Sequence, residues 1–211
     1  MTTKTIITLG RQFGSGGRAV GKKLAEDLGI PYYDKEILQR AAKESGICES
    51  LFENHDEKPT SSFLYSLVMD TYSAGYAAMG MQEMPMSQKV FLAQFDTIKK
   101  IATEGPCVIV GRCADYALEE LDNVVSVFVH APLDKRAARV AEYEKIEIAA
   151  AKKLVLQNDK KRASYYNYYS NKKWGDGATY DLCINTGKVG IYGAAEMIKN
   201  YVIMKETKIN F

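Results

Sequence analysis

The sequence predicts an α/β protein with a doubly wound, five-stranded parallel sheet, and two observations lead to this fold class. First, five apolar runs of strand length recur along the 211 residues, with amphipathic segments of helical spacing between them. Second, the runs at 108–110 and 125–129 are almost continuously apolar, which is typical of strands that helices cover on both faces. Sheets of this kind bind ligands at the carboxyl ends of their strands.

The apolar runs and the segments between them give the expected elements in order. The expected strands are Thr5–Leu9, Ile30–Tyr33, Cys107–Val110, Val124–Val129 and Tyr180–Ile184. The expected helices are Ala19–Leu28, Lys35–Ser45, Cys113–Leu121, Leu133–Glu144 and Gly193–Met204.

Two stretches interrupt this alternation, and we treat both as excursions from a single domain, 1–211. Residues 46–100 contain no convincing strand and predict a helical insert, in which the methionines of Met69–Met86 fill gaps rather than line a pocket. Residues 146–176 predict a long basic helix, rich in tyrosine, that leads into a turn at Gly175–Gly177.

The composition is that of an ordinary globular protein, with 46% hydrophobic and 26% charged residues. A formal net charge of +2 argues against a dedicated nucleic-acid binder. Between residues 132 and 174, however, eleven Lys or Arg accompany five Asp or Glu, which suits either an anionic ligand or a solvated helix face. The cluster Tyr165–Tyr169 could stack on bases, but its helical spacing favours packing against the domain or against a second subunit of a homodimer.

The cysteines predict a reduced protein without a metal centre. Cys48, Cys107, Cys113 and Cys183 are scattered, none forms a Cys-x-x-Cys pair, and the chain has only two histidines. Cys107 and Cys183 fall in apolar runs, so we expect them to be buried in strands. Met1 leads into a polar and then a strand-like segment, and no run of eighteen apolar residues occurs. We therefore expect a cytoplasmic protein with neither a signal peptide nor a membrane span.

The most informative stretch is Gly10–Arg18, which follows the first expected strand and opens the first expected helix. Glycines let a backbone approach an anion closely, and backbone N–H groups and a helix N-terminus together bind phosphate. The residues expected to bind phosphate here are Gly14, Ser15, Gly16, Gly17, Arg18 and Ala19. The loop lacks the Lys of the standard motif Gly-x-x-x-x-Gly-Lys-[Ser/Thr]. Two registers place either Gly17 or Arg18 at the position of that Lys.

Further residues point to anion chemistry as well. Asp34 ends the second apolar run, where it can cap the next helix or contact a substrate, and Arg40 follows six residues later. Arg112 comes directly after a buried strand and a glycine, at the edge where ligands bind. The basic stretch contributes Arg139 and Arg162, which suit a closing lid around a transferring phosphoryl group if they are not merely part of a solvated face.

Together these motifs resemble cytidylate kinases, and more closely the divergent cytidylate-kinase-like family of the P-loop NTPases, over most of the chain. Gly14–Arg18 is similar to the family's phosphate loop. Asp34 and Arg40 match the Asp and Arg of its Asp-Ser-Gly-x-x-Tyr-Arg motif with the same separation, although Lys35–Ile37 replaces the small residues after the Asp.

Three later segments extend the resemblance. Gly111 and Arg112 match the family's Gly-Arg-Asp, with Cys113 in place of the Asp. Lys135–Arg139 matches a Glu-Arg-Ala-x-Arg helix, and Asp159–Arg162 lies where the arginine-rich lid belongs.

The resemblance implies the fold of a nucleoside monophosphate kinase, with 46–100 as a helical acceptor-binding insert and 146–176 as the lid. The implied acceptor-binding residues are Asp34, Arg40 and Arg112. The implied catalytic residues, which would hold the transferring phosphoryl group, are Arg18, Arg139 and Arg162. ATP and Mg²⁺ are implied in the same way.

The expected function is therefore an ATP-dependent phosphotransferase that moves the γ-phosphoryl group to a nucleoside monophosphate, cytidylate-like, or to a related small phosphate acceptor. Because the loop lacks its Lys, the alternative is a nucleotide-binding sensor or partner-binding protein with weak or no kinase activity. Arginines at every anion position favour the kinase. The expected partners are small nucleotides, with neither nucleic acid nor membrane among them.

Overall fold

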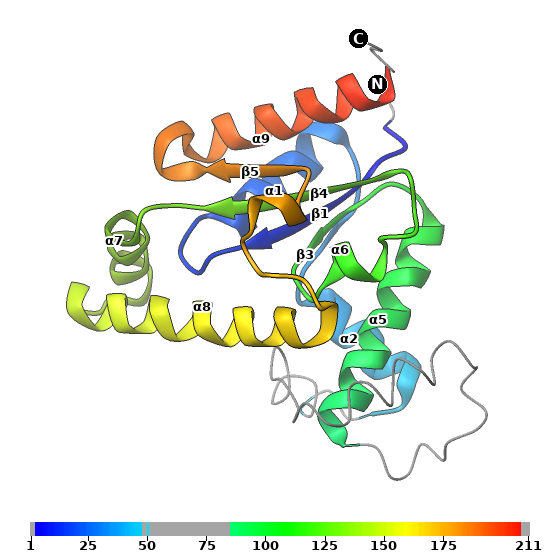
Figure 1. The fold of residues 1–211 in the computed structure, drawn as a ribbon, viewed down its shortest axis with the longest axis horizontal. Helices are drawn as coiled ribbons and strands as arrows, with labels where there is room; N and C mark the ends of the chain where they lie inside the picture. The colour runs from blue at the N-terminus through cyan, green and yellow to red at the C-terminus, as the bar shows by residue number, and fades with distance from the viewer. Residues whose placement is uncertain (1–2, 48–49, 51–84, 208–211) are drawn as a thin grey trace.

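The computed structural model describes residues 3–47, 50 and 85–207. Its centre is a five-stranded parallel sheet, as the sequence predicts, and the strand order is β2-β3-β1-β4-β5 (Figure 1). The strands are β1 (Ile6–Arg11), β2 (Tyr32–Tyr33), β3 (Val108–Val110), β4 (Val124–His130) and β5 (Leu182–Asn185). The first strand lies in the middle, so the glycine-rich loop that follows it leaves the centre of the sheet's carboxyl edge.

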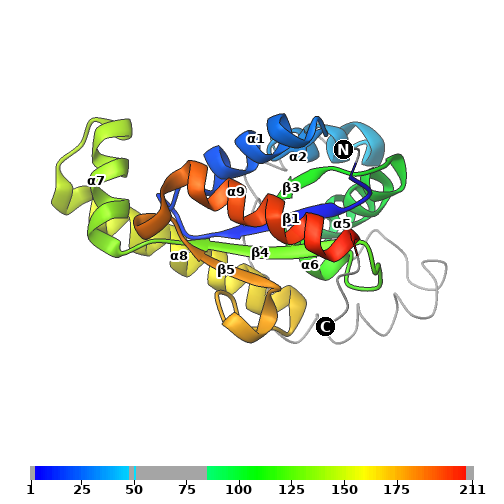
Figure 2. The same ribbon diagram turned by 90° about the horizontal axis from the view of Figure 1, so that it is seen from above.

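Helices cover both faces of the sheet. They are α1 (Gly17–Leu28), α2 (Glu36–Ser45), α5 (Met86–Glu104), α6 (Ala114–Ala117), α7 (Leu133–Glu144), α8 (Ile148–Ser170) and α9 (Thr186–Glu206), with a 3₁₀ turn at Gly177–Thr179. Figure 2 shows α1 and α9 together on one face of the sheet, with α8 and α6 on the other. Helix α7 projects beyond the carboxyl ends of the strands (Figure 1).

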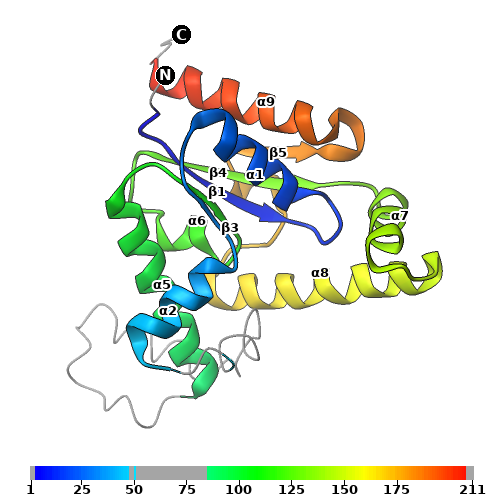
Figure 3. The same cartoon turned by 180° about the vertical axis from the view of Figure 1, so that it is seen from behind.

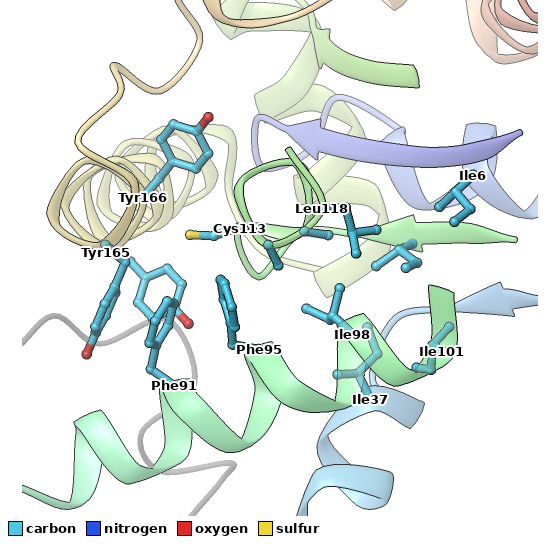
Figure 4. Close-up of a cluster of buried hydrophobic side chains, with 14 of the residues drawn as sticks. Ile6, Ile37, Phe91, Phe95, Ile98, Ile101, Cys113, Leu118, Tyr165 and Tyr166 are labelled. Atoms are coloured by element: carbon cyan, nitrogen blue, oxygen red, sulfur yellow. The ribbon is translucent and has the colours of Figure 1, made fainter. Parts of the chain in front are cut away.

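The two faces of the sheet have different cores. Between the sheet and α1 with α9 the buried side chains are mostly aliphatic, for example Leu9, Leu24 and Val127. Between the sheet and α5, α6 and α8 the core is aromatic. Figure 4 shows Phe91 and Phe95 of α5 beside Tyr165 of α8.

The tyrosine cluster belongs to this aromatic core. Tyr165, Tyr166 and Tyr169 are buried, and the ring of Tyr169 stacks on Phe91 with 3.8 Å between the ring centroids. Rings that pack inside the domain do not offer their faces to bases. The interpretation that these tyrosines pack α8 against the domain is the one that the structure bears out.

Several predicted boundaries shift. Helix α6 has one turn rather than the predicted 113–121. It begins only after residues 112 and 113 because their backbone angles are left-handed. It ends before the two acidic residues at 119–120, which disfavour a helix C-terminus. Helix α9 begins seven residues before the predicted Gly193, with a break at Gly190 (φ 72°). Helix α8 ends at Ser170 rather than Trp174, because Asn171 adopts a left-handed conformation.

One cysteine is placed differently from the prediction. Cys107 is buried in the core, but Cys183 is exposed, because β5 is an edge strand and this residue lies on its open side. Cys48 and the methionines of 69–84 lie outside the described residues, as does most of the predicted insert. Within the described residues no helix is long and apolar enough to span a membrane.

The two ends of the described chain are tied together. The Glu206 carboxylate at the end of α9 accepts hydrogen bonds from the hydroxyl groups of Thr3 (2.6 Å) and Thr5 (2.7 Å), just before β1. Figure 3 shows this corner from behind, with the start of β1 beside the end of α9. It lies at the edge of the sheet opposite the glycine-rich loop.

Candidate active site

The glycine-rich loop between β1 and α1 has a backbone that only glycine adopts easily. Gly14 (φ 74°) and Gly16 (φ 85°) are both left-handed. A Cβ at Gly14 would also lie 2.8 Å from the carbonyl oxygen of Arg136 and 2.8 Å from Val140 Cγ2. Gly14 is therefore required both by its conformation and by the close approach of α7, and Gly16 is required by its conformation.

The N-terminus of α1 opens directly onto this loop. Gly16 is the N-cap, no side chain caps the helix, and its first turn contains no acidic residue. The first N–H groups of a helix have no partner within the helix and carry a partial positive charge. In this geometry the twelve-residue helix can bind an anion through its backbone.

Ser15 has a different role from its neighbours. Its side chain is fully buried, and its hydroxyl donates to the carbonyl oxygen of Gln12 at 2.8 Å. The carbonyl oxygen of Ser15 accepts from the Thr186 hydroxyl at 2.6 Å. The side chain thus holds the loop together from inside and does not line the pocket described next.

A pocket of about 340 Å³ lies over the loop, and it brings most of the predicted phosphate-binding residues together. Gly14, Gly16, Gly17, Arg18 and Ala19 line it, together with Arg139 and Arg162. The ring of Tyr143, which is 83% exposed, stands at its border. The structure thus places two of the predicted lid arginines at the loop.

Both of these arginines are bonded to the loop backbone. Arg139 Nη1 donates to the carbonyl oxygen of Gly14 at 2.6 Å. Arg162 Nη1 donates to the carbonyl oxygen of Arg11 at 3.3 Å, and its guanidinium lies 5.5 Å from the centroid of the Phe13 ring. Both side chains are only partly buried and line the pocket, so their positive charges are accessible from it.

A buried ion pair fixes the loop from behind. Asp159 accepts from the Phe13 N–H at 2.7 Å and from Arg136 Nη1 at 2.5 Å, while Arg136 also donates to the Phe13 carbonyl oxygen at 3.1 Å. Both backbone groups of Phe13 are therefore held by α7 and α8. This pair was not predicted, because 23 residues separate Arg136 and Asp159 in the sequence. Their opposite charges on neighbouring helices were the available signal.

Asp34 is the centre of a second charged group, at the carboxyl end of β2. Its carboxylate is 2.6 Å from Arg18 Nε and 3.1 Å from Arg112 Nη1. Burial by itself would raise the pKa of Asp34, but the guanidinium groups of Arg11, Arg112 and Arg18 outweigh it and bring that pKa below its usual value. Three guanidinium groups therefore act on this one carboxylate next to the loop.

The backbone before α6 places Arg112 in this group. Gly111, Arg112 and Cys113 have φ angles of 80°, 55° and 54°. Left-handed conformations cost a non-glycine residue of the order of 1 kcal/mol each, and such strain gathers at functional sites. The result is a guanidinium that is buried yet directed to Asp34.

Arg40 lies elsewhere. Its Nη1 is 2.9 Å from Glu104 at the end of α5, a second bond joins Nη2 to the same carboxylate, and its Nε is 3.0 Å from Glu44. The structure therefore brings Arg18, Arg112 and Asp34 together but not Arg40, whose predicted contact with an acceptor stays a prediction.

A small second cavity, of about 20 Å³, lies on the other side of Arg112. Arg11, Arg112 and Arg162 line it together with Asp115 and Tyr166, and the Tyr166 hydroxyl donates to Asp115 at 2.5 Å. Burial raises the pKa of the Asp115 carboxyl. Arg11, which was not among the predicted binding residues, borders both cavities.

The described residues offer little to a bound metal ion. No group of three His, Cys, Asp or Glu side chains comes together among them. The carboxylate of Asp34 is engaged by Arg18 and Arg112. These residues do not fit a metal centre held by protein ligands alone.

Comparison with known sequences agrees with this geometry. The sequence profile of the cytidylate kinase-like family matches residues 6–188. A relative named cytidylate kinase from Pyrococcus horikoshii is 28% identical over 198 residues, which are 93% of this chain and 87% of the relative. Another cytidylate kinase, from Methanopyrus kandleri, is 25% identical over 193 residues, 87% of this chain and 85% of that protein.

Solved structures share the fold. An uncharacterized protein from Eubacterium ventriosum is 34% identical with a TM-score of 0.72, over 95% of this chain and 99% of that one. Shikimate kinase from Bacteroides thetaiotaomicron, 14% identical with a TM-score of 0.52 over 94% of this chain and 98% of its own, has the same fold. With its glycine-rich loop at the centre of a five-stranded parallel sheet, this chain belongs to the cytidylate kinase-like family and has the fold of the P-loop kinases.

Proposed function

We propose that the protein is an ATP-dependent phosphotransferase whose acceptor is a nucleoside monophosphate, cytidylate-like, or a related small phosphate compound. The observation that carries this proposal is the convergence of Arg18, Arg139 and Arg162 on one pocket over an uncapped helix N-terminus. Such a site suits the phosphate groups of a nucleotide. The names of the relatives, cytidylate kinase, support the acceptor class.

In this proposal different residues bind the phosphate donor and the phosphate acceptor. The loop backbone of Gly14–Ala19 binds the donor phosphates, and Arg139 and Arg162 hold the phosphoryl group while it moves. Asp34 and Arg112, beside the loop at the carboxyl ends of β2 and β3, bind the acceptor. Phosphoryl transfer asks the protein for position and charge rather than for a nucleophile, so this arrangement is sufficient in kind.

Mg²⁺ enters this proposal as part of the nucleotide. Mg²⁺ keeps several water ligands and is often held by substrate phosphates with one or two protein groups. Because the described residues build no metal centre of their own, we assign the ion to the donor phosphates and derive no step of the protein from it.

The two segments that interrupt the alternation of strands and helices, and the partners of the protein, are part of this proposal. Residues 46–100 are the acceptor-binding insert, 146–176 the lid, and the substrates are small nucleotides. In the present geometry α8 lies against the loop through Arg162 and Asp159. A homodimer and a cytoplasmic location stay predictions from the sequence.

The test is a coupled assay with ATP and a panel of nucleoside monophosphates that includes CMP, dCMP, UMP, AMP and GMP. We expect turnover of one or two of them. Arg162→Ala should lower kcat by about 100-fold, since the loss of one transition-state donor has an effect of that order. Lys161→Ala, the exposed neighbour on α8, is the matched control and should retain activity.

A melting experiment separates the proposal from its alternative. A ligand that binds the folded state raises the melting temperature, so ATP should raise it in either case. If ATP stabilises the protein but no monophosphate is ever phosphorylated, the protein is a nucleotide-binding sensor and the kinase proposal fails.

A further inference from the structure

Gly17, the first residue of α1, is a glycine for reasons of space. Its φ angle is not in the left-handed range, so its backbone does not require glycine. A Cβ at this position would lie 2.6 Å from Arg11 Cβ and 3.1 Å from Arg11 Cγ, closer than packed atoms approach. The stem of the Arg11 side chain therefore occupies the place where a side chain of residue 17 would begin.

A second glycine makes room for the other end of the same side chain. A Cβ at Gly111 would lie 2.7 Å from Arg11 Cζ and 3.1 Å from its Nη2. The Arg11 side chain thus passes from Gly17 at its stem to Gly111 at its guanidinium. It is 6% exposed and reaches from the glycine-rich loop to the carboxyl end of β3, which Gly111 and Arg112 follow in the chain.

The position of Arg11 in the loop completes the pattern. When Gly16, the N-cap of α1, is aligned with the last glycine of Gly-x-x-x-x-Gly-Lys, Gly17 stands at the Lys and Arg11 stands at the first glycine. This chain therefore reads Arg-x-x-x-x-Gly-Gly. The small residue and the cation have exchanged ends of the motif, and the structure shows their side-chain positions in contact.

Arg18, the other cation near this position, is placed less well. Its side chain is 54% exposed, and its Nε lies 2.6 Å from Asp34. Arg11 is buried, lines both the pocket over the loop and the small cavity beside Arg112, and is the strongest of the three cations in lowering the pKa of Asp34. It thus joins the pocket assigned above to the donor with the surroundings of Arg112, which is assigned to the acceptor.

We propose that Arg11 supplies, from the end of β1, the phosphate-binding cation that the standard loop takes from the Lys at the start of its helix. This inference rests on the proposed function only in that the loop binds nucleotide phosphates. It assigns a specific phosphate-binding residue and explains why Gly17 has no side chain.

The test is to move the cation from position 11 to position 17, where the standard motif has its Lys. Variants of the whole chain are compared with the wild type for the binding of ATP and of inorganic triphosphate, by calorimetry and by melting temperature. Arg11→Met removes the charge and keeps the length, Arg11→Lys restores a charge, and Gly17→Lys adds a side chain against Arg11. The reciprocal variant Arg11→Gly with Gly17→Lys rebuilds the standard motif.

We expect Arg11→Met to weaken binding of both ligands by about tenfold or more, the range of a charged hydrogen bond, and Arg11→Lys to recover part of it. Gly17→Lys alone should lower the melting temperature and the affinity, whereas the reciprocal variant should bind ATP within a few fold of the wild type. Lys22→Met, an exposed cation of α1 that does not line the pocket, is the matched control and should change affinity less than threefold. Arg18→Met should weaken binding less than Arg11→Met does. Circular dichroism identifies any variant that does not fold, and the reciprocal variant then decides.

The outcomes separate this inference from the proposed function. If Arg11→Met binds ATP as tightly as the wild type while Arg18→Met does not, Arg18 is the cation and the inference is overturned, while the phosphotransferase proposal stands. A reciprocal variant that folds but does not bind ATP contradicts the inference too. If the wild type binds ATP and phosphorylates no monophosphate, the proposed function fails and the role of Arg11 in binding is still decided by the affinities.

Discussion

Two carboxyl groups near the same edge of the sheet, Asp34 and Asp115, differ in their partners. Asp34 is surrounded by guanidinium groups, which lower its pKa against the effect of burial. Asp115 accepts from the Tyr166 hydroxyl, and burial raises its pKa. The comparison teaches that the partners decide whether burial prevails: guanidinium groups outweigh it at Asp34, whereas the Tyr166 hydroxyl does not outweigh it at Asp115.

The largest effect should come from breaking the group around Asp34. Asp34→Ala leaves Arg112, whose side chain is 2% exposed, beside other cations without the carboxylate that balances them. Loss of one partner of a buried ion pair destabilises a protein by about 3–5 kcal/mol, so we expect a loss of that order in the free energy of unfolding, measured with urea.

The matched control for this variant is Asp134→Ala, whose side chain is 83% exposed beside Lys152. Surface changes of this kind usually stay within about 0.5 kcal/mol. Equal losses of unfolding free energy in the two variants would show that the guanidinium groups around Asp34 do not depend on its carboxylate for stability.

The region around Asp115 should respond less strongly. Tyr166→Phe removes the hydroxyl that donates to the half-buried Asp115 and leaves an acceptor without its donor, at a cost of about 1–3 kcal/mol. Urea unfolding measures this loss, and Tyr143→Phe, at an 83% exposed position, should have none. A Tyr166→Phe variant as stable as the wild type would mean that water replaces the hydroxyl.

The pH dependence of stability should have opposite signs in the two regions. The pKa of Asp115 is raised in the folded state, so the folded protein binds more protons than the unfolded chain, and stability falls as the pH rises from the usual Asp pKa through the raised one. The pKa of Asp34 is lowered, so its contribution is present above the usual Asp pKa and is lost as the pH falls through the lowered one. Each slope is at most about 1.4 kcal/mol per pH unit.

Asp115→Asn checks this sign. Its profile of unfolding free energy against pH should be flatter than that of the wild type above the usual Asp pKa, and unchanged on the acid side. A profile that stays equally steep above that pKa would place the titrating group elsewhere.

The smallest change in stability should follow from Arg40→Met. The pair of Arg40 with Glu104 is partly exposed, and exposed ion pairs contribute little, so the melting temperature should fall by less than about 2 °C. The same variant tests the prediction that Arg40 binds the acceptor. If Arg40 contacts the acceptor, the variant raises the KM for the acceptor. If Arg40 only pairs with Glu104, that KM does not change.

Much of the fold could be predicted from patterns that are local in the chain. Buried strands such as Val108–Val110 are continuously apolar, and the switch from strand to helix is marked by the glycines of the loop. The length of α6 could not be predicted, since it depends on the left-handed angles of Arg112 and Cys113, which no pattern of hydrophobicity reports.

The site was predictable in its composition but not in its pairing. The sequence identified Asp34, Arg112 and the loop as anion-binding candidates, and the structure places them together. The role of Arg11 depends on the space beside Gly17 and Gly111, which only a folded chain defines. The partner of Arg40 comes from α5, 64 residues further along the chain, where helical periodicity gives no information.

The grip of Asp159 and Arg136 on both backbone groups of Phe13 has a consequence for how the protein senses its ligand. Any nucleotide that tightens the loop must, by thermodynamic reciprocity, also favour the position of α8 in which Asp159 keeps this grip. The amide hydrogens of α8 should therefore exchange more slowly with solvent when ATP is bound. Because the middle of α8 is bonded to Phe13, slower exchange along this helix would be a measure of nucleotide binding at the glycine-rich loop.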